Sequence, residues 1–210
     1  MLASMQKNGL RLALFACACT ALVALIDQVT RPLIAKQSDA QLQRTLSQLL
    51  PAELYDNDLG KSCLQLHLPS LLGDDKPHPV YVARRGDKVT GYIIESVAPH
   101  GYSGAIRLLT AISTDGSVQK VQVLMHKETP GLGDKIERSK SNWIDSFNGQ
   151  QLHGETDPRW AVKKDGGMFD SFTGATITPR AVVSGVKNAL LVLQAHQTEL
   201  AQAPACEEQP

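Results

Sequence analysis

The chain has 210 residues, of which 42% are hydrophobic and 20% are charged. This composition supports one sizeable core and excludes a chain that is disordered throughout. Lysine plus arginine and aspartate plus glutamate are equal at 21 each, so the chain lacks the basic excess that is typical of a nucleic-acid-binding surface. The four cysteines have no Cys-x-x-Cys spacing, which argues against an iron-sulfur or zinc site built by this chain alone.

The N-terminal part of the chain carries the longest apolar segment. The run from Leu12 to Ile26 contains no charged residue, and Lys7 and Arg11 precede it. A transmembrane helix needs about 20 residues, and extending the run to residues 10–29 reaches that length if the side chain of Arg11 snorkels to the interface. A cleaved secretory signal is the alternative, but no small-x-small cleavage site follows the run. We expect an uncleaved transmembrane anchor at residues 10–29, after a cytoplasmic N-terminus at residues 1–9.

Residues 30–60 are predicted to connect the anchor to a folded domain. Apolar residues at helical spacing predict a helix from Ser38 to Leu50, and Pro51 ends it because proline cannot continue a helix. Beyond this linker, short apolar alternations predict five strands. Two of their connections carry hairpin turn sequences, so we expect an antiparallel sheet. The five strands are expected at Ser62 to Leu68, Val80 to Arg84, Val89 to Val97, Ile106 to Thr114 and Val118 to His126.

The C-terminal third is predicted to add helices to this sheet. The apolar pattern favours a helix from Asp134 to Phe147, a short strand from Trp160 to Lys164, and a final helix from Thr178 to about Leu200. The expected fold is therefore α+β, with one domain at residues 61–200 in which helices flank an antiparallel sheet. Residues 201–210 are polar and are expected to form a flexible tail.

Residues 170–176, with the sequence Asp-Ser-Phe-Thr-Gly-Ala-Thr, are the most specific pattern in the chain. Gly174 and Ala175 allow the backbone to approach a ligand closely. Thr178 and Pro179 fit the start of a helix, so an anion carried on Thr176 would lie near the positive end of that helix. On physical grounds alone, the simpler interpretation is a turn that only caps the helix.

This segment resembles a known attachment motif. Asp170, Thr173, Gly174, Ala175 and Thr176 match the Asp-x-x-Ser/Thr-Gly-Ala-Thr pattern at which flavin transferases attach FMN. The resemblance implies a covalent FMN cofactor held by a phosphoester to Thr176, and a flavin transferase that acts with FAD and magnesium during maturation. It also implies that Asp170 helps the transferase to recognise the loop, whose shape the next three motif residues fix.

Two further motifs extend the resemblance over most of the chain. One is the run from Glu128 to Gly133, and the other contains Tyr102 and Ser103 between two glycines. Both resemble the FMN-binding domains in the G subunit of Rnf-type electron-transport complexes and in the related C subunit of sodium-translocating quinone reductases, and the compact length favours the former. The cofactor-binding residues implied besides the attachment motif are Tyr102, Ser103, Glu128, Thr129, Pro130, Gly131, Leu132 and Gly133.

The resemblance implies a membrane-anchored flavoprotein that relays electrons within an ion-translocating complex. Its partners would be the other membrane subunits, and its main domain would lie on the periplasmic side of the bacterial inner membrane. No catalytic residue of its own, no metal site and no nucleic-acid partner are expected. Two alternatives stay open, namely a C-subunit-like component of a sodium-translocating NADH:quinone reductase and a non-redox anchored extracytoplasmic binding or adaptor domain.

Several side chains allow two interpretations at this stage. Tyr102 and Phe172 could pack against the isoalloxazine ring or belong to the core. Cys63 and Cys206 lie outside the apolar segment and could form a disulfide in an oxidising compartment, and the sequence leaves this pairing open. Three basic residues near the motif could balance a phosphodiester charge or could simply be solvated: Lys163, Lys164 and Arg180.

Overall fold

The computed structural model describes residues 2–206, with backbone alone at residues 2–7, 29 and 31–39. The chain divides into two units between Arg44 and Thr45.

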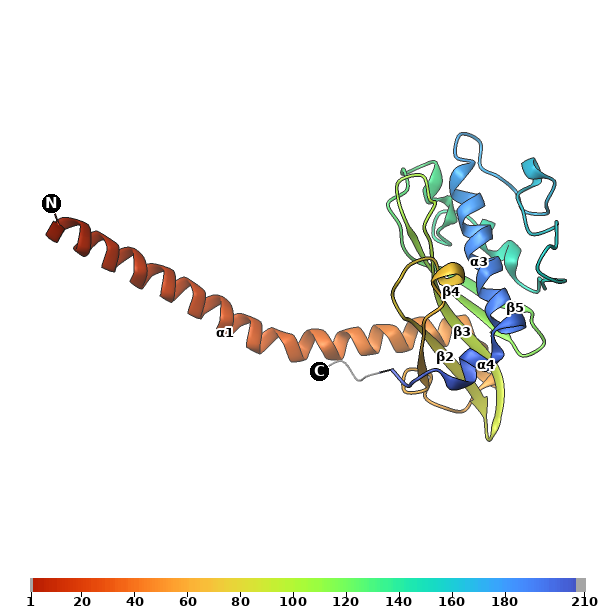
Figure 1. Cartoon of the computed structure of the whole chain (residues 1–210), viewed down its shortest axis with the longest axis horizontal. Coiled ribbons are helices and arrows are strands. Elements are labelled where there is room, and N and C mark those ends of the chain that lie inside the picture. Colours follow the sequence, from red (N-terminus) through yellow and green to blue (C-terminus); the bar gives the residue numbers. More distant parts are fainter. Residues whose placement is uncertain (1, 207–210) are drawn as a thin grey trace. The chain divides into compact units, whose positions relative to one another are not determined.

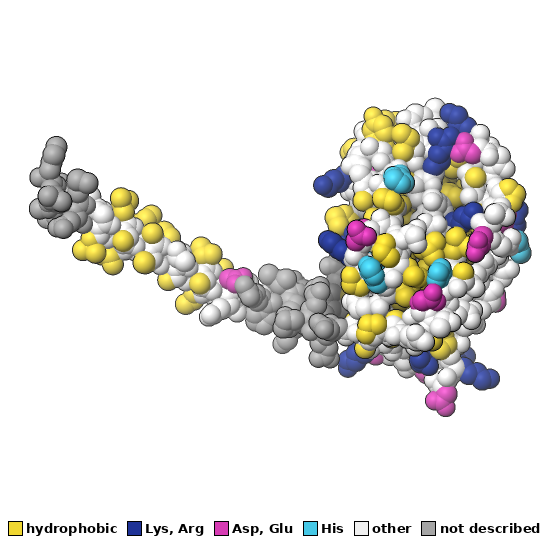
Figure 2. All heavy atoms as spheres, in the orientation of Figure 1, with side chains coloured by type: hydrophobic (Ala, Val, Ile, Leu, Met, Phe, Trp, Pro, Cys, Tyr) yellow, Lys and Arg dark blue, Asp and Glu magenta, His cyan; other side chains and the backbone are white. Residues whose placement is uncertain are grey.

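The first unit is helical. Helix α1 runs without interruption from Leu2 to Leu49, so the linker helix expected from Ser38 is the C-terminal part of the same helix. Residues Asn8–Gln28 are long and apolar enough to cross a membrane, and none of their side chains is buried. Apolar side chains follow one another along this stretch in Figure 2. The prediction of an N-terminal apolar helix is confirmed, and α1 ends just before Pro51, as predicted.

The second unit is built on a five-stranded antiparallel sheet with the strands in sequence order, which confirms the expected fold class. Facing residue pairs such as Val80 with Ile94 and Ile94 with Thr110 define the register. The sheet was predictable because strand-like runs and turn sequences follow one another along the chain. The strands are β1 Cys63–Leu66, β2 His78–Arg85, β3 Lys88–Ala98, β4 Ile106–Ser113 and β5 Val118–Met125.

Helix α3, Ile177–Ala195, packs against strands β3 and β4 and forms the main core with them (Figure 1). Its buried residues recur at three-and-four spacing, as in Val182, Val186 and Ala189, which is the pattern of a helix with one face on a sheet. Gly185 packs directly against the sheet, because a Cβ atom there would be 2.9 Å from Leu108 Cδ1. The short elements η1 Ala52–Leu54 and α2 Pro69–Leu72 complete the N-terminal half of the unit.

The segment between β5 and α3 differs from the prediction. The helix expected from Asp134 to Phe147 is replaced by two 3₁₀ helices, η2 Gly133–Ile136 and η3 Trp143–Phe147. Ser141 interrupts the helical pattern, since its hydroxyl donates to Lys135 O and accepts from Trp143 N, and such bonds compete with a continuous helix. The strand expected at Trp160 to Lys164 is also absent. Val162 forms only an isolated bridge with Phe169, and η4 Lys163–Asp165 follows it.

The C-terminal end of the domain is more ordered than predicted. The final helix divides at His196 into α3 and α4, Gln197–Gln202. Residues 204–206 then pair with β1, where Ala205 forms a bridge with Leu64. Residues 201–206 of the expected flexible tail thus include the end of α4 and the segment paired with β1, and residues 207–210 lie outside the described part of the chain.

Candidate functional site

A buried carboxylate joins three segments of the FMN-type motifs. Glu128 is 4% exposed. Its Oε1 atom accepts a hydrogen bond from Ser103 N at 3.0 Å, and its Oε2 atom accepts one from the hydroxyl of Thr178 at 2.5 Å. The motif around Ser103, the loop that begins at Glu128 and the first turn of α3 therefore meet at one side chain.

Two glycines make this meeting possible because the space beside Glu128 has no room for a side chain. A Cβ atom at Gly133 would lie 2.9 Å from both Glu128 and the hydroxyl oxygen of Thr178. A Cβ atom at Gly101 would lie 2.2 Å from Gly104 O and 2.9 Å from Glu128 Oε1. Contacts this close are essentially unknown for real Cβ atoms, so these positions require glycine.

His126 holds the backbone of Glu128 by a hydrogen bond, a role that the sequence did not reveal. Its Nδ1 atom accepts a hydrogen bond from Glu128 N at 3.0 Å, and its Nε2 atom lies 2.6 Å from Glu137 Oε1. Because Nδ1 accepts a hydrogen bond, the ring proton is on Nε2, and Nε2 donates a hydrogen bond to Glu137. This hydrogen bond lowers the pKa of Glu137, so a charged carboxylate anchors the imidazole that orients the loop.

The loop from Thr129 to Gly133 folds tightly and reaches the attachment motif. Thr129 O accepts hydrogen bonds from the amides of Leu132 and Gly133, both at 3.1 Å. Gly131 has a φ of +78° in open space, a conformation that favours glycine. Leu132 is the nearest neighbour of Gly174, with 3.6 Å between Leu132 Cδ2 and a Cβ built on the glycine. The structure therefore brings the two predicted loops side by side.

Thr176 occupies the position immediately before α3 but does not cap the helix. Its backbone is in the right-handed helical region, with φ −81° and ψ −22°, and its side chain makes no capping hydrogen bond. An N-cap threonine normally has an extended backbone and accepts an amide hydrogen bond. The structure therefore disagrees with the simple capping interpretation. The half-buried hydroxyl of Thr176 is not committed to the helix.

The remainder of the attachment motif forms a turn fixed by its backbone. Ala175 N donates to Phe172 O at 3.2 Å, and Gly174 between them has a φ of +81°. Thr173 and Gly174 are exposed. The Asp170 carbonyl accepts a hydrogen bond from Trp143 Nε1 at 2.8 Å, so the buried indole holds the start of the motif.

Two of the three basic residues near the motif, Lys163 and Arg180, are paired with carboxylates. Lys163 Nζ lies 2.7 Å from Asp170 Oδ1, and both side chains are largely exposed. Arg180 makes two bonds of 2.6 Å to Asp165, and its guanidinium lowers the pKa of that carboxyl. A phosphate near Thr176 would therefore have to share or displace a partner to use either cation.

The two aromatic candidates have different surroundings. Phe172 is buried, with its ring centroid 5.1 Å from that of Trp143 in an edge arrangement, so it belongs to the core. Tyr102 is 68% exposed. Two other apolar side chains, Leu132 and Ile177, are 42% and 44% exposed. Each of these three residues is next in sequence to a residue that lies against Glu128. We call the three side chains the apolar rim: Tyr102, Leu132 and Ile177.

Ile177 was not singled out from the sequence because an apolar residue at a helix start suggests only packing. It also lines an apolar cavity of about 310 Å³ between α3 and the end of β3. Val97, Ala98, Ala181 and Gly185 supply much of the wall. Ile177 thus belongs both to the apolar rim and to a recess along the first turns of α3.

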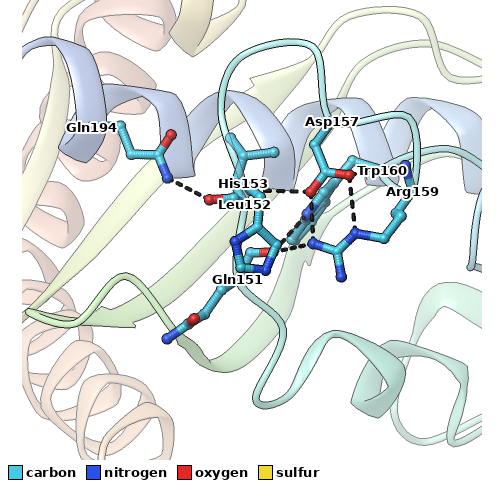
Figure 3. Close-up of polar contacts among 7 residues, drawn as sticks. All are labelled: Gln151, Leu152, His153, Asp157, Arg159, Trp160 and Gln194. Atoms are coloured by element: carbon cyan, nitrogen blue, oxygen red, sulfur yellow. Dashed lines mark hydrogen bonds and ion pairs between the residues drawn. The ribbon is translucent and has the colours of Figure 1, made fainter.

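A cluster of hydrogen bonds around Asp157 orders the loop that leads toward the attachment motif (Figure 3). The buried Asp157 carboxylate accepts hydrogen bonds from the amides of His153 and Arg159, at 3.0 and 3.1 Å. The Arg159 guanidinium adds two more, at 2.7 and 3.0 Å, and lowers the pKa of Asp157 far below its ordinary value. Trp160 Nε1 donates to Gln151 O from the same loop.

The loop that contains the Asp157 cluster is joined to helix α3 and packs against the aromatic core. Gln194 of α3 donates to Leu152 O at 2.7 Å, as Figure 3 shows. The Trp160 ring lies 5.2 Å from that of Phe169, and Phe169 stacks on Phe147 at 4.4 Å. Asp170 follows Phe169 directly, so this packed segment fixes where the attachment motif begins.

Comparison with known proteins defines the class to which this site belongs. The model of the FMN-binding domain matches residues 101–191, which contain Ser103, Glu128, Thr176 and Thr178. A model described as the RnfG N-terminal region matches residues 1–49. The second unit is therefore an FMN-binding domain that follows an N-terminal region of the RnfG type.

Similarity to curated relatives extends over the whole chain. A protein of Shewanella loihica is 51% identical over 98% of both chains, and one of Yersinia pestis is 50% identical over 99% of both. A protein of Escherichia coli K12 is 49% identical over 99% of this chain and 100% of its own. Each is named as the G subunit of an ion-translocating oxidoreductase complex. The chain belongs to this G-subunit family.

Proposed function

We propose that the chain is a membrane flavoprotein subunit that relays electrons within an ion-translocating oxidoreductase complex, through FMN joined to Thr176 by a phosphoester. The observation that carries the proposal is the Thr176 hydroxyl, which is held at the start of α3 and left out of the helix cap. The family of the chain and its FMN-binding domain support the flavoprotein assignment. The other subunits of such a complex are its partners.

Thr176 serves as the acceptor and not as a catalyst. A neutral threonine hydroxyl is a poor nucleophile without an activating base, and no side chain within the described residues is hydrogen-bonded to it. An external flavin transferase therefore makes the bond from FAD, with magnesium. The FAD pyrophosphate bond breaks, the phosphoester to Thr176 forms, the hydroxyl proton is lost and AMP leaves.

The bound flavin supplies the redox chemistry, and the chain supplies position. The apolar rim of Tyr102, Leu132 and Ile177 offers exposed surface on which a flat ring can pack. Glu128 holds the three segments that carry these side chains in a fixed relation. A covalent bond keeps the cofactor at a fixed high local concentration, which a freely dissociating flavin would not have.

The domain is proposed to lie on the periplasmic side of the inner membrane, with residues Asn8–Gln28 as the anchor. The disulfide between Cys63 and Cys206 supports this side, because such bonds persist in oxidising compartments and are rare in the cytosol. Positive and negative side chains are interspersed over the face shown in Figure 2, which suits a solvent-facing domain.

The test is the mass of the natively matured protein co-expressed with its transferase. The wild-type peptide that contains Thr176 should carry the increment of esterified FMN, and its denatured band should fluoresce. Thr176→Ala should lose both signals, while Ser171→Ala, which removes a hydroxyl five residues away, should keep them.

Three other outcomes decide between the alternatives. An unmodified wild type would overturn the covalent assignment and favour the adaptor alternative. FMN that remains in Thr176→Ala would place the bond on another residue. If the flavin is present but the chain co-purifies with quinone-reductase subunits, the C-subunit-like alternative is favoured.

A further inference from the structure

The last described residues form a strand-like addition to the edge of the sheet. Gln65 N donates to Pro204 O at 2.8 Å, and Cys206 N donates to Cys63 O at 3.0 Å. Between these bonds, Leu64 and Ala205 form an antiparallel bridge. Residues 204–206 therefore pair with the side of β1 that β2 leaves open, since β1 is the first strand of the sheet.

This addition is anchored at both ends. On one side, Leu200 of α4 is 4% exposed and Ala203 packs against the main core. On the other, Cys63 and Cys206 are joined by a disulfide, with their Cα atoms 5.3 Å apart. That separation falls within the range of about 4.4–6.8 Å for disulfide-bonded residues. Cys63 itself is buried on β1.

An unpaired edge strand is a hazard because its free amides and carbonyls invite pairing with other chains. The two backbone bonds from residues 204–206 satisfy such groups on β1. A segment this short holds only a few bonds and would fray without further restraint. The crosslink is placed where it prevents that fraying.

We propose that Cys63 and Cys206 form a maturation disulfide, a C-terminal latch that locks residues 203–206 onto β1 and closes that edge of the sheet. The two thiols are oxidised by exchange with a dithiol-disulfide carrier protein. Its disulfide is reduced to two thiols as the Cys63–Cys206 bond forms, so electrons and protons balance. Within the described residues, no hydrogen bond joins residues 63–66 or 203–206 to Glu128 or to residues 170–176, so loss of the latch should leave flavin attachment unchanged.

The first test counts thiols in the full-length protein taken from membranes. The protein is denatured without reductant, alkylated with one reagent, reduced and alkylated with a second. Cys17 and Cys19 are not crosslinked and should carry the first label, which makes them an internal control. Cys63 and Cys206 should carry only the second. A first label on all four cysteines would overturn the latch.

The second test measures what the crosslink holds in place. Hydrogen exchange at the amides of residues 65 and 206 should be about tenfold faster or more in Cys206→Ser than in the wild type. Cys17→Ser serves as the control and should exchange like the wild type at both amides. Flavin occupancy, read by intact mass, should be equal in all three. Unchanged exchange in Cys206→Ser would show that the segment stays paired without the crosslink and would refute the latch.

Discussion

The Glu128 carboxylate and the Thr178 hydroxyl, fifty residues apart in the chain, form a buried hydrogen bond of 2.5 Å at the first turn of α3. The bond links the loop that ends at Gly133 to the helix that Thr176 precedes. It also places a carboxylate close to the helix N-terminus, where negative charge is stabilising. This pair joins the helix that follows the attachment motif to the loop that begins at Glu128.

Thr178→Val should destabilise the domain by about 1.5–3 kcal/mol, because a buried charge-assisted hydrogen bond is lost while the shape of the side chain is kept. Urea unfolding of the matured protein measures the change. Thr173→Val alters an exposed threonine of the same motif and should change stability by less than about 0.5 kcal/mol. Equal losses in the two variants would show that the Glu128 bond is not a distinct source of stability.

Gly133→Ala and Gly131→Ala should differ in how they combine with Thr178→Val. Alanine at residue 133 would collide with both partners of the buried bond, whereas residue 131 has open space and only an unfavourable φ of +78°. Gly133→Ala should therefore be non-additive with Thr178→Val, by about 0.5–3 kcal/mol. Gly131→Ala should add to it within about 0.5 kcal/mol. The measurement is a pair of double-mutant cycles in urea, and additivity at residue 133 would contradict the packing argument.

The sheet was predictable because its information is local. Short strand-like runs in β3 and β4 and the turn at Asp115 and Gly116 specify strands and a hairpin without reference to distant parts of the chain. The attachment motif could likewise be identified from the sequence because it is a short contiguous pattern. Thr178 was identified only as a helix start, because its partner Glu128 lies fifty residues away.

The errors have the same physical origin. The apolar spacing from Asp134 to Phe147 favours a helix, and the competing bonds of Ser141 become visible only in three dimensions. The polar C-terminal sequence suggested a flexible tail, and its order comes from pairing with β1, about 140 residues away. Contacts between distant segments, rather than local propensity, decide both regions.

Asp157→Ala should lower the melting temperature more than Asp157→Asn. Alanine removes every acceptor and leaves the part-buried amides of His153 and Arg159 without their partner, and a donor that is left unsatisfied costs up to about 1–3 kcal/mol. Asparagine keeps one acceptor oxygen but loses the charge. We expect a decrease of roughly 5 °C or more for alanine in a domain of this size, measured by calorimetry.

The same scan in acid tests the charge of Asp157. Because Arg159 holds the pKa of this carboxyl below its ordinary value, the contribution to stability is present at neutral pH and is lost as the pH falls below about 4. Asp157→Asn should therefore flatten the acid side of the stability curve. Glu155→Gln, an exposed change in the same loop, should leave both the melting temperature and the acid slope as in the wild type.

His78 should make the domain less stable as the pH rises. Its side chain is 5% exposed and lies between two carboxylates, with Nε2 2.8 Å from Asp74 and Nδ1 3.7 Å from Glu95. Burial alone would lower the pKa of His78, but the nearby Glu95 carboxylate and the hydrogen bond to Asp74 outweigh it and raise the pKa above the ordinary 6.5. Arg107 forms an ion pair with the same Glu95.

A raised folded-state pKa means that the protonated imidazole stabilises the fold fully below about pH 6.5. The contribution is lost as the pH rises through the folded-state value. Melting temperatures of the wild type should therefore fall between about pH 6.5 and 9 relative to those of His78→Gln, which cannot titrate there. His153→Gln changes an exposed histidine and should leave the wild-type profile unchanged. If the His78→Gln and wild-type curves run parallel over this interval, the imidazole is not charged in the folded protein, and Arg107 alone balances Glu95.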